Sequence, residues 1–169
     1  MANLAQMVNV LVAIITSPQG YYLQTIYHPL RVYAEQCGPL AVDSHVACAP
    51  DELYTLNPEQ SPQAAKVADL GPFPYLDVSA TCDPAARTVT VCVVNRHLER
   101  TLSADLLLLG GTARGQGKIF EIRAAPDARN SFAQPDAVQV QESPWPAQGS
   151  HLRYDFPPHS VTVLKMGYV

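Results

Sequence analysis

The stretch YLDVSATCDPAARTVTVCVVNRH, residues 75–97, decides the fold of this chain. Apolar and polar residues alternate over 76–81, and the segment 88–95 is rich in valine and threonine. Alternation with a period of two places one set of side chains on a core face and the other towards solvent, as in a β-strand. Between the two segments, Asp83 and Pro84 favour a turn. The stretch therefore predicts a β-hairpin, which needs further strands around it to be stable.

Short segments with strand character, separated by Gly and Pro, lie on both sides of this hairpin. We expect strands at 40–47, 102–109, 118–124, 137–141, 151–156 and 160–166, turns at 110–117 and 144–149, and a long surface loop at 48–71. Such a series is typical of an antiparallel β-sandwich.

The first 38 residues have a different pattern. Residues 1–15 are largely apolar and suit either a helical turn with one polar stripe or, over 10–15, a buried strand. A turn is expected at 17–20. Pro29 can open a helix at its first turn, and the Gly-Pro pair at 38–39 ends it. This opening is short and very apolar for an independent domain.

Composition and charge exclude several classes of function. The chain has 169 residues and a formal net charge of −4, with acidic and basic residues scattered. Nucleic acid and anionic membranes need a basic patch, so neither is expected as a partner. No apolar run reaches the length of a membrane span, and residues 1–15 lack the basic start of a secretory signal. We therefore expect a cytoplasmic protein.

The four cysteines do not have the spacing of a metal site. They form no Cys-x-x-Cys pair, and no His lies at a zinc-ligand spacing from them, so we expect neither metal nor cofactor. Cys92 lies between two valines and is expected to be a small buried hydrophobe. The sequence leaves open whether Cys37, Cys48, Cys82 or Cys92 form disulfides.

Six phrases give the chain a more specific signature. They are MANLAQMVNV at 1–10, QTIYHPL at 24–30, LDVSA at 76–80, VVNRH at 93–97, NSFAQPDAV at 130–138 and PPHSVTVL at 157–164. In this order and spacing they resemble the C-terminal part of the α-L-arabinofuranosidases of glycoside hydrolase family 51. Any one phrase is weak, but six in register over nearly the whole chain are specific.

This resemblance implies a fold and a function. A full-length member is a (β/α)8 barrel joined to a jelly-roll β-sandwich, is often an oligomer, and removes terminal arabinofuranosyl groups from arabinan, arabinoxylan or their oligosaccharides with retention. Residues 1–38 would be the end of the barrel, with its last strand, loop and helix, and 39–169 the sandwich. The expected fold is thus mainly β: an antiparallel jelly-roll sandwich preceded by a short α/β remnant of the barrel.

The resemblance also implies that no catalytic residue lies in this chain. Retaining glycosidases need two carboxyl groups about 5 Å apart, and in the family both glutamates precede the matching region. Glu35 would lie on the last barrel helix. Asp43, Asp77, Asp105 and Glu121 lie on or beside predicted strands, where we expect solvated side chains.

Gln24 is the one expected substrate-binding residue. By the resemblance it matches a glutamine after the last barrel strand that hydrogen-bonds arabinose, and an amide can both donate to and accept from sugar hydroxyls. The family often has an aromatic residue and an Arg just before this glutamine. Here Tyr22 and Leu23 stand in those places, so the details of the loop differ.

Other motifs have simpler explanations. The glycine-rich stretch ending at Lys118 lacks the spacing of a phosphate loop and is expected to be a hairpin. Asn95 and His97 are expected to organise a turn, and His159 to cap the last strand. Trp145 is expected to pack on the sandwich, although an exposed sugar-stacking ring is the alternative.

Three hypotheses follow. The first is a non-catalytic C-terminal fragment of an α-L-arabinofuranosidase, which supports a barrel acting on arabinose-containing polysaccharide or oligosaccharide. Its apolar N-terminal segment would contact the missing barrel half or another copy of the chain. The second is a stand-alone carbohydrate-binding sandwich, by analogy of fold. The third is one half of a split enzyme.

Overall fold

The computed structural model describes residues 8–9, 13–49, 53–54 and 72–169. The elements in chain order are β1 (Ile14–Ser17), β2 (Gly20–Leu23), α1 (Tyr27–Gln36), β3 (Leu40–Val42), β4 (Leu53–Tyr54), β5 (Phe73–Pro74), β6 (Leu76–Asp83), β7 (Thr88–Asn95), β8 (Leu102–Leu107), β9 (Ala113–Arg123), β10 (Gln141–Pro146), β11 (His151–Phe156) and β12 (Ser160–Tyr168). The predicted mainly antiparallel β class is confirmed. No helix in this part of the chain has the length and hydropathy of a membrane span.

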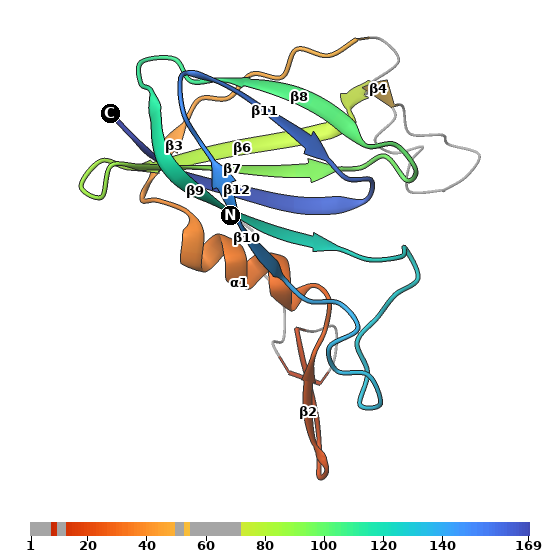
Figure 1. The fold of residues 1–169 in the computed structure, drawn as a ribbon. Coiled ribbons are helices and arrows are strands. Elements are labelled where there is room, and N and C mark those ends of the chain that lie inside the picture. Colours follow the sequence, from red (N-terminus) through yellow and green to blue (C-terminus); the bar gives the residue numbers. More distant parts are fainter. Residues whose placement is uncertain (1–7, 10–12, 50–52, 55–71) are drawn as a thin grey trace.

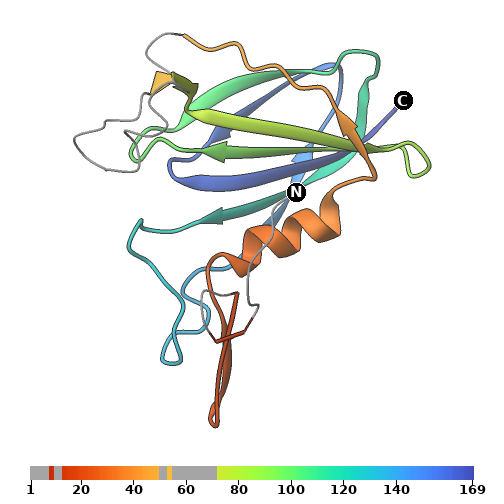
Figure 2. The same ribbon diagram turned by 180° about the vertical axis from the view of Figure 1, so that it is seen from behind.

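The strands form a sandwich with a helix on its outer face. One antiparallel sheet has the order β10-β9-β12-β7-β6-β3, and β8 pairs with β11 in a second sheet. Figure 1 shows β8 and β11 over one face of the large sheet and α1 over the other. The β1–β2 hairpin projects away from the sandwich beyond α1, as the view from behind also shows (Figure 2).

Both faces of the central strands are buried, which explains their continuous apolar sequence. On β12, Leu164 belongs to the core between the two sheets, together with Val91 and Phe156. The neighbouring Val163 points to the other side and packs with Val32 of α1. Strand β12 thus contributes side chains to two hydrophobic cores, one between the two sheets and one between the large sheet and α1. The second core attaches α1 to the sheet.

The predicted hairpin and its turn are confirmed, although its first strand continues to Asp83 rather than ending at Thr81. Strands β6 and β7 pair from Leu76 opposite Asn95 to Asp83 opposite Thr88. The Asp83 carboxylate accepts hydrogen bonds from the backbone nitrogens of Ala85 (2.9 Å) and Ala86 (3.0 Å). The turn therefore uses the Asp side chain as the sequence suggested.

The predicted helix is also present, although it begins earlier than Pro29. Residue Pro29 is the third residue of α1, within the first turn, where its missing N–H has no intrahelical partner to lose. After the helix, a Cβ on Gly38 would lie 2.3 Å from the Cys82 carbonyl oxygen, so only glycine fits this approach. The Thr90 hydroxyl donates to the Gln36 carbonyl at 2.8 Å and ties the helix end to β7.

Several predicted boundaries are wrong. The strand expected at 40–47 ends at Val42, and the one expected at 102–109 ends at Leu107. The expected turn at 110–117 is too long, because β9 already begins at Ala113 and pairs with β12 through a β-bulge. The strand expected at 137–141 lies instead at Gln141–Pro146.

The error at β10 has a clear physical reason. Pro144 and Pro146 were expected in a turn, but β10 is an edge strand that pairs only with β9. Proline is tolerated on an edge because its missing N–H can face away from the ladder. The expectation for 1–15 lies partly outside the described residues, as does most of the 48–71 loop. The jelly-roll connection and the boundary at 38/39 stay predictions.

Candidate functional site

Gln24 lies between the β1–β2 hairpin and α1, and its backbone is held on both sides. Its N–H donates to the Ala13 carbonyl at 2.9 Å, and its carbonyl accepts from the Tyr27 N–H at 2.9 Å. The side chain is half-buried. Its amide has no hydrogen-bond partner among the residues that the structure describes. The role predicted for Gln24 stays a prediction.

The hairpin that precedes Gln24 is a local structure. Strands β1 and β2 pair from Ile14 opposite Leu23 to Ser17 opposite Gly20. Asn9 binds β1 through two hydrogen bonds. Its side-chain amide donates to the Thr16 hydroxyl at 2.7 Å and accepts from the Thr16 N–H at 2.7 Å. The predicted turn at 17–20 is confirmed, and it closes the hairpin.

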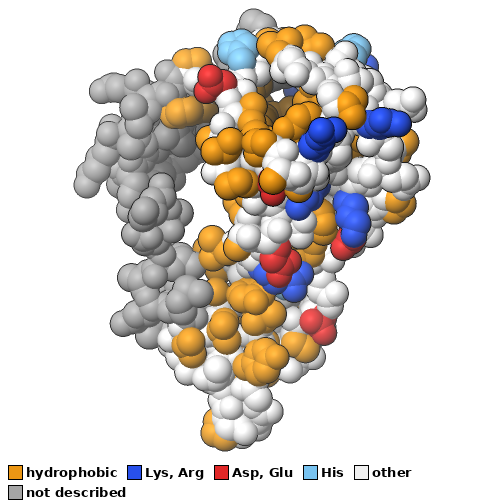
Figure 3. Space-filling model, turned by 90° about the vertical axis from the view of Figure 1, so that its left-hand side faces the viewer, with side chains coloured by type: hydrophobic (Ala, Val, Ile, Leu, Met, Phe, Trp, Pro, Cys, Tyr) orange, Lys and Arg blue, Asp and Glu red, His pale blue; other side chains and the backbone are white. Residues whose placement is uncertain are grey.

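Exposed apolar side chains lie on this hairpin, on α1 and on the residues next to them. We call it the hairpin–helix surface and define it by four side chains with exposed fractions between 37% and 68%: Val8, Tyr21, Ile26 and Leu30. Figure 3 shows hydrophobic side chains over the lower part of this face, with others higher up and with charged side chains beside them. Exposed apolar clusters of this kind mark interaction sites.

His28 and Asn130 form a buried polar contact behind this surface, which the sequence analysis missed. The Asn130 amide nitrogen lies 3.3 Å from His28 Nε2 and donates to the Leu23 carbonyl at 2.8 Å. Burial and the nearby Arg31 guanidinium lower the pKa of His28. The only signal in the sequence was that both residues lie inside phrases that resemble the family.

The five acidic residues singled out from the sequence, all of them within the described part of the chain, have separate environments. Asp77 pairs with Arg96, and Glu35 lies 3.8 Å from Arg31 one helical turn away. Asp105 is exposed and lies 3.7 Å from His151. Each of these carboxylates faces a basic side chain, and Asp43 is exposed to solvent.

Glu121 corrects one expectation. Its side chain is only 14% exposed, whereas a solvated position was predicted. The carboxylate accepts a hydrogen bond from the Tyr154 hydroxyl at 3.2 Å and lies 3.4 Å from Arg123. Burial and this carboxylate raise the pKa of Tyr154 to about 12. Glu121 thus joins the two sheets and is not poised as an acid or a nucleophile.

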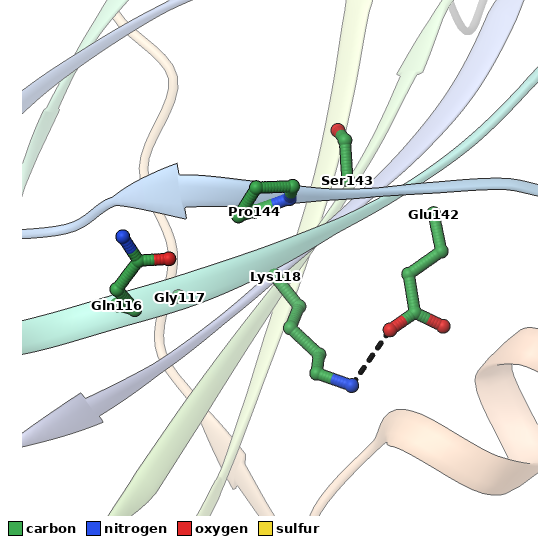
Figure 4. Close-up of a pocket in the computed structure, with 6 residues that line it drawn as sticks. All are labelled: Gln116, Gly117, Lys118, Glu142, Ser143 and Pro144. Carbon is green, nitrogen blue, oxygen red and sulfur yellow. Dashed lines mark hydrogen bonds and ion pairs between the residues drawn. The ribbon is translucent and has the colours of Figure 1, made fainter.

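Two hollows in the surface offer no better site. The smaller, of about 350 Å³, lies between β9 and β10, and Figure 4 shows Lys118 reaching Glu142 across it. These two charges are 2.6 Å apart and exposed, so they satisfy each other. The larger hollow, of about 980 Å³, lies between the large sheet and β8 and has a largely apolar lining that includes Val91 and Leu106. The segment after β3 adds Ser44, His45 and Cys48 to the lining of this larger hollow.

Comparison with known proteins identifies the family. The family model described as "Alpha-L-arabinofuranosidase C-terminal domain" matches residues 1–160. The chain belongs to this family.

Its curated relatives are longer than the chain. A probable α-L-arabinofuranosidase C of Aspergillus flavus is 31% identical over 165 residues, which cover 98% of this chain and 30% of that protein. The corresponding protein of Aspergillus niger is 32% identical over the same proportions. The arabinofuranosidase domain described here therefore spans about a third of the length of these relatives.

Solved structures share the fold. The α-L-arabinofuranosidase of Thermotoga maritima, in an arabinose complex, has a TM-score of 0.80 at 23% identity, over 99% of this chain and 34% of that chain. The thermostable GH51 enzyme of Thermotoga petrophila has a TM-score of 0.78 at 23% identity, over 98% of this chain and 33% of that chain. In each, the arabinofuranosidase domain fold accounts for about one third of the protein.

Other sequence predictions for this arabinofuranosidase domain are confirmed as structural. Trp145 is buried in the core between the sheets, with its ring edge-to-face with Tyr154 at 6.0 Å. The His97 ring accepts from the backbone nitrogens of Glu99 and Arg100, and thus organises the turn after β7. Lys118 lies inside β9, so the glycine-rich stretch is not a phosphate loop. The hairpin expected there is wrong, because β8 and β9 belong to different sheets and the stretch crosses between them.

The four cysteines of the domain form no disulfide in this structure, and two of them touch. Cys92 is buried as predicted, and its sulfur lies 3.7 Å from that of Cys37 at the end of α1. All four cysteines are free thiols. Burial and the Cys37 thiol raise the pKa of Cys92 to about 12, which makes it a packing residue and not a nucleophile.

Proposed function

We propose that this chain is the C-terminal, non-catalytic part of an α-L-arabinofuranosidase and works with a (β/α)8 barrel that carries the catalytic carboxyls. The observation that carries the proposal is the family match over residues 1–160, in a chain that spans 30% of its A. flavus relative. Among the described residues, the carboxylates of Glu35, Asp77, Asp105 and Glu121 each face a basic or hydroxyl group, which supports the non-catalytic role.

The parent enzyme would release terminal α-L-arabinofuranosyl groups from arabinan, arabinoxylan or their oligosaccharides, with retention. Within this chain, Gln24 would contribute to the sugar site. Its fixed backbone and its half-buried amide, which has no partner among the described residues, support this role. An amide can both donate hydrogen bonds to hydroxyl groups and accept them.

The hairpin–helix surface would pack against the barrel. Tyr21 and Ile26 flank Gln24 in the sequence and are exposed, so a partner that covers them also reaches Gln24. Burial of apolar surface contributes about 25 cal/mol per Å², which favours a covered state of such a cluster. A second copy of the chain on the same surface would be the other outcome of a test.

We further propose a cytoplasmic location. The free thiols of Cys37, Cys48, Cys82 and Cys92 fit a reducing compartment. Fractionation of the native host with an antibody against the chain tests this, and recovery from the culture medium would overturn it.

Reconstitution tests the proposed function. The chain would be mixed, or co-expressed, with the separately produced upstream part of a family member, and hydrolysis of an aryl α-L-arabinofuranoside would be followed. We expect turnover from the mixture. Gln24→Ala would lower kcat/KM about 10- to 100-fold, as the loss of one or two sugar hydrogen bonds predicts. Gln19→Ala, in the exposed turn of the same hairpin, would leave it unchanged.

The alternative, a stand-alone carbohydrate-binding sandwich, has weaker support. Such modules present exposed aromatic rings to the sugar, but Trp145, the single tryptophan, is buried. Saturable binding of arabinan or xylan fragments to the isolated chain would favour this alternative. Activity that appears only when two separate natural chains are combined would favour a split enzyme.

A further inference from the structure

A loop of the sandwich reaches the segment that carries Gln24. Residues 124–140 connect β9 to β10, and Figures 1 and 2 both show this connection descending beside the β1–β2 hairpin. The Phe132 ring meets the Tyr22 ring of β2 edge-to-face, with centroids 4.9 Å apart. Residues more than 100 positions apart in the sequence are therefore in direct contact next to Gln24.

Asn130 is the polar centre of this contact. Its amide nitrogen donates to the carbonyls of Leu23 (2.8 Å) and Val138 (3.0 Å), and its amide oxygen accepts from the Val138 N–H at 2.7 Å. The side chain is buried. Since Oδ1 and Nδ2 both engage Val138, the loop itself fixes the orientation of the amide, and the remaining donor points at β2.

The Leu23 carbonyl belongs to the peptide group that joins Leu23 to Gln24. The N–H of this same peptide group donates to Ala13, and the carbonyl of Gln24 accepts from Tyr27. Asn130 therefore completes a set of three hydrogen bonds that fix both peptide groups around Gln24. A polar side chain with fixed backbone on both sides loses less conformational freedom when it binds a ligand.

We propose that Asn130 is a positioning residue for Gln24: from the β9–β10 loop it fixes the backbone from which the Gln24 amide reaches the hydroxyl groups of an arabinofuranosyl unit. This inference rests on the function proposed above. It gives the sandwich a specific role in the sugar site, beyond support of the barrel, because the loop acts on Gln24 through hydrogen bonds rather than through general packing. Phe132 assists by holding Tyr22.

Amide hydrogen exchange on the purified chain tests the positioning directly. Asn130→Asp keeps the oxygen that accepts from Val138 but replaces the donor with a carboxylate oxygen facing the Leu23 carbonyl. We expect exchange of the Gln24 amide to accelerate at least about tenfold, with the amides of β7 and β12 unchanged. Ser131→Ala is the matched control, because Ser131 bonds only within the loop, to the Gln134 N–H, and it should leave Gln24 exchange unchanged.

Two outcomes would overturn the proposal. One is unchanged Gln24 exchange in Asn130→Asp, and the other is an acceleration shared equally by Gln24 and the core strands, which indicates only a general loss of stability. If Asn130→Asp fails to fold, Phe132→Ala provides the second test. This half-exposed ring is expected to tolerate truncation, and Gln24 exchange should still rise about threefold; no change there would overturn the proposal as well.

A double-mutant cycle in the reconstituted enzyme separates this inference from the proposed function. If Asn130 acts through Gln24, Asn130→Asp lowers kcat/KM in the wild-type background but not in the Gln24→Ala background. An equal loss in both backgrounds would contradict positioning. If Gln24→Ala itself has no effect on kcat/KM, the sugar role of Gln24 fails, while the exchange result still decides whether Asn130 fixes the segment.

Discussion

The side-chain amide nitrogen of Asn95 lies 3.0 Å from the Phe156 carbonyl oxygen, across 61 residues of sequence. The same nitrogen donates to the carbonyls of Pro157 (2.9 Å) and Arg100 (3.0 Å), and the amide oxygen accepts from the His97 N–H at 2.9 Å. One buried side chain thus ends β7, shapes the loop after it and closes the corner between β11 and β12.

Replacing Asn95 by Ala should therefore destabilise the whole domain. The change removes the Asn95 donor from the buried carbonyls of Phe156 and Pro157, although the Ser160 hydroxyl still donates to the Pro157 carbonyl. We expect a loss of about 2–4 kcal/mol in the free energy of unfolding. Urea denaturation measures it. Ser103→Ala, on the exposed face of β8, is the control and should stay within about 0.5 kcal/mol of wild type. A loss below about 1 kcal/mol for Asn95→Ala would mean that water replaces the amide.

Two buried threonines on adjacent strands offer a matched comparison. Thr162 and Thr90 are both fully buried, but the Thr90 hydroxyl donates to Gln36, whereas the Thr162 hydroxyl has no partner among the described residues. We expect Thr90→Val to cost about 1–2 kcal/mol and Thr162→Val to be neutral or to stabilise by up to about 1 kcal/mol. Equal costs in thermal or urea unfolding would contradict this account.

The stability of the domain should fall as the pH drops below about 6.5, in part because of His28. Burial and Arg31 lower the pKa of His28 in the folded chain, against opposing effects of Asp136 and the Val138 backbone. The unfolded chain then binds a proton that the folded chain resists, so stability present above pH 6.5 is lost between this value and the folded pKa.

Urea unfolding between pH 8 and pH 5 measures this dependence. The slope below pH 6.5 should be shallower in His28→Gln than in wild type. Identical slopes in wild type and His28→Gln would show that His28 does not contribute.

The sequence predicted those elements whose signals are local. The β6–β7 hairpin is indicated by the alternation of apolar and polar residues and by the turn residues Asp83 and Pro84. Both signals lie within the hairpin's own sequence. The prediction of β10 was wrong because Pro144 and Pro146 are turn signals in the sequence. Only the pairing with β9 shows that the segment is an edge strand, where proline is tolerated. The predicted start of β9 was wrong for a similar reason. Its glycines suggested a turn, but a β-bulge against β12 accommodates them within the strand.

The candidate site shows the same limit. Gln24 could be singled out because its phrase resembles a family motif. The contact of Asn130 with Leu23 joins residues 107 positions apart, and no periodicity or spacing encodes it. Glu121 was expected in solvent because its own strand gives no sign of Tyr154, which reaches it from the second sheet.

Cys92 should resist alkylation in the native chain. Its thiol pKa of about 12 leaves little thiolate at pH 8, and the thiolate is the reactive form. Native treatment with iodoacetamide followed by peptide mass spectrometry should label Cys92 at least about 100-fold more slowly than the half-buried Cys48. All four cysteines should react in denaturant. Equal labelling of Cys92 and Cys48 in the native chain would contradict the buried position.

Hydrolysis of an aryl α-L-arabinofuranoside by the purified 169-residue chain alone tests the central claim most directly. The account predicts no turnover above the uncatalysed rate, even at high protein concentration, because Glu35, Asp77, Asp105 and Glu121 each face a basic or hydroxyl group and Asp43 is exposed to solvent. Turnover that follows the protein through every purification step would contradict it, since two carboxyl groups of this chain would then have to lie about 5 Å apart across a glycosidic bond.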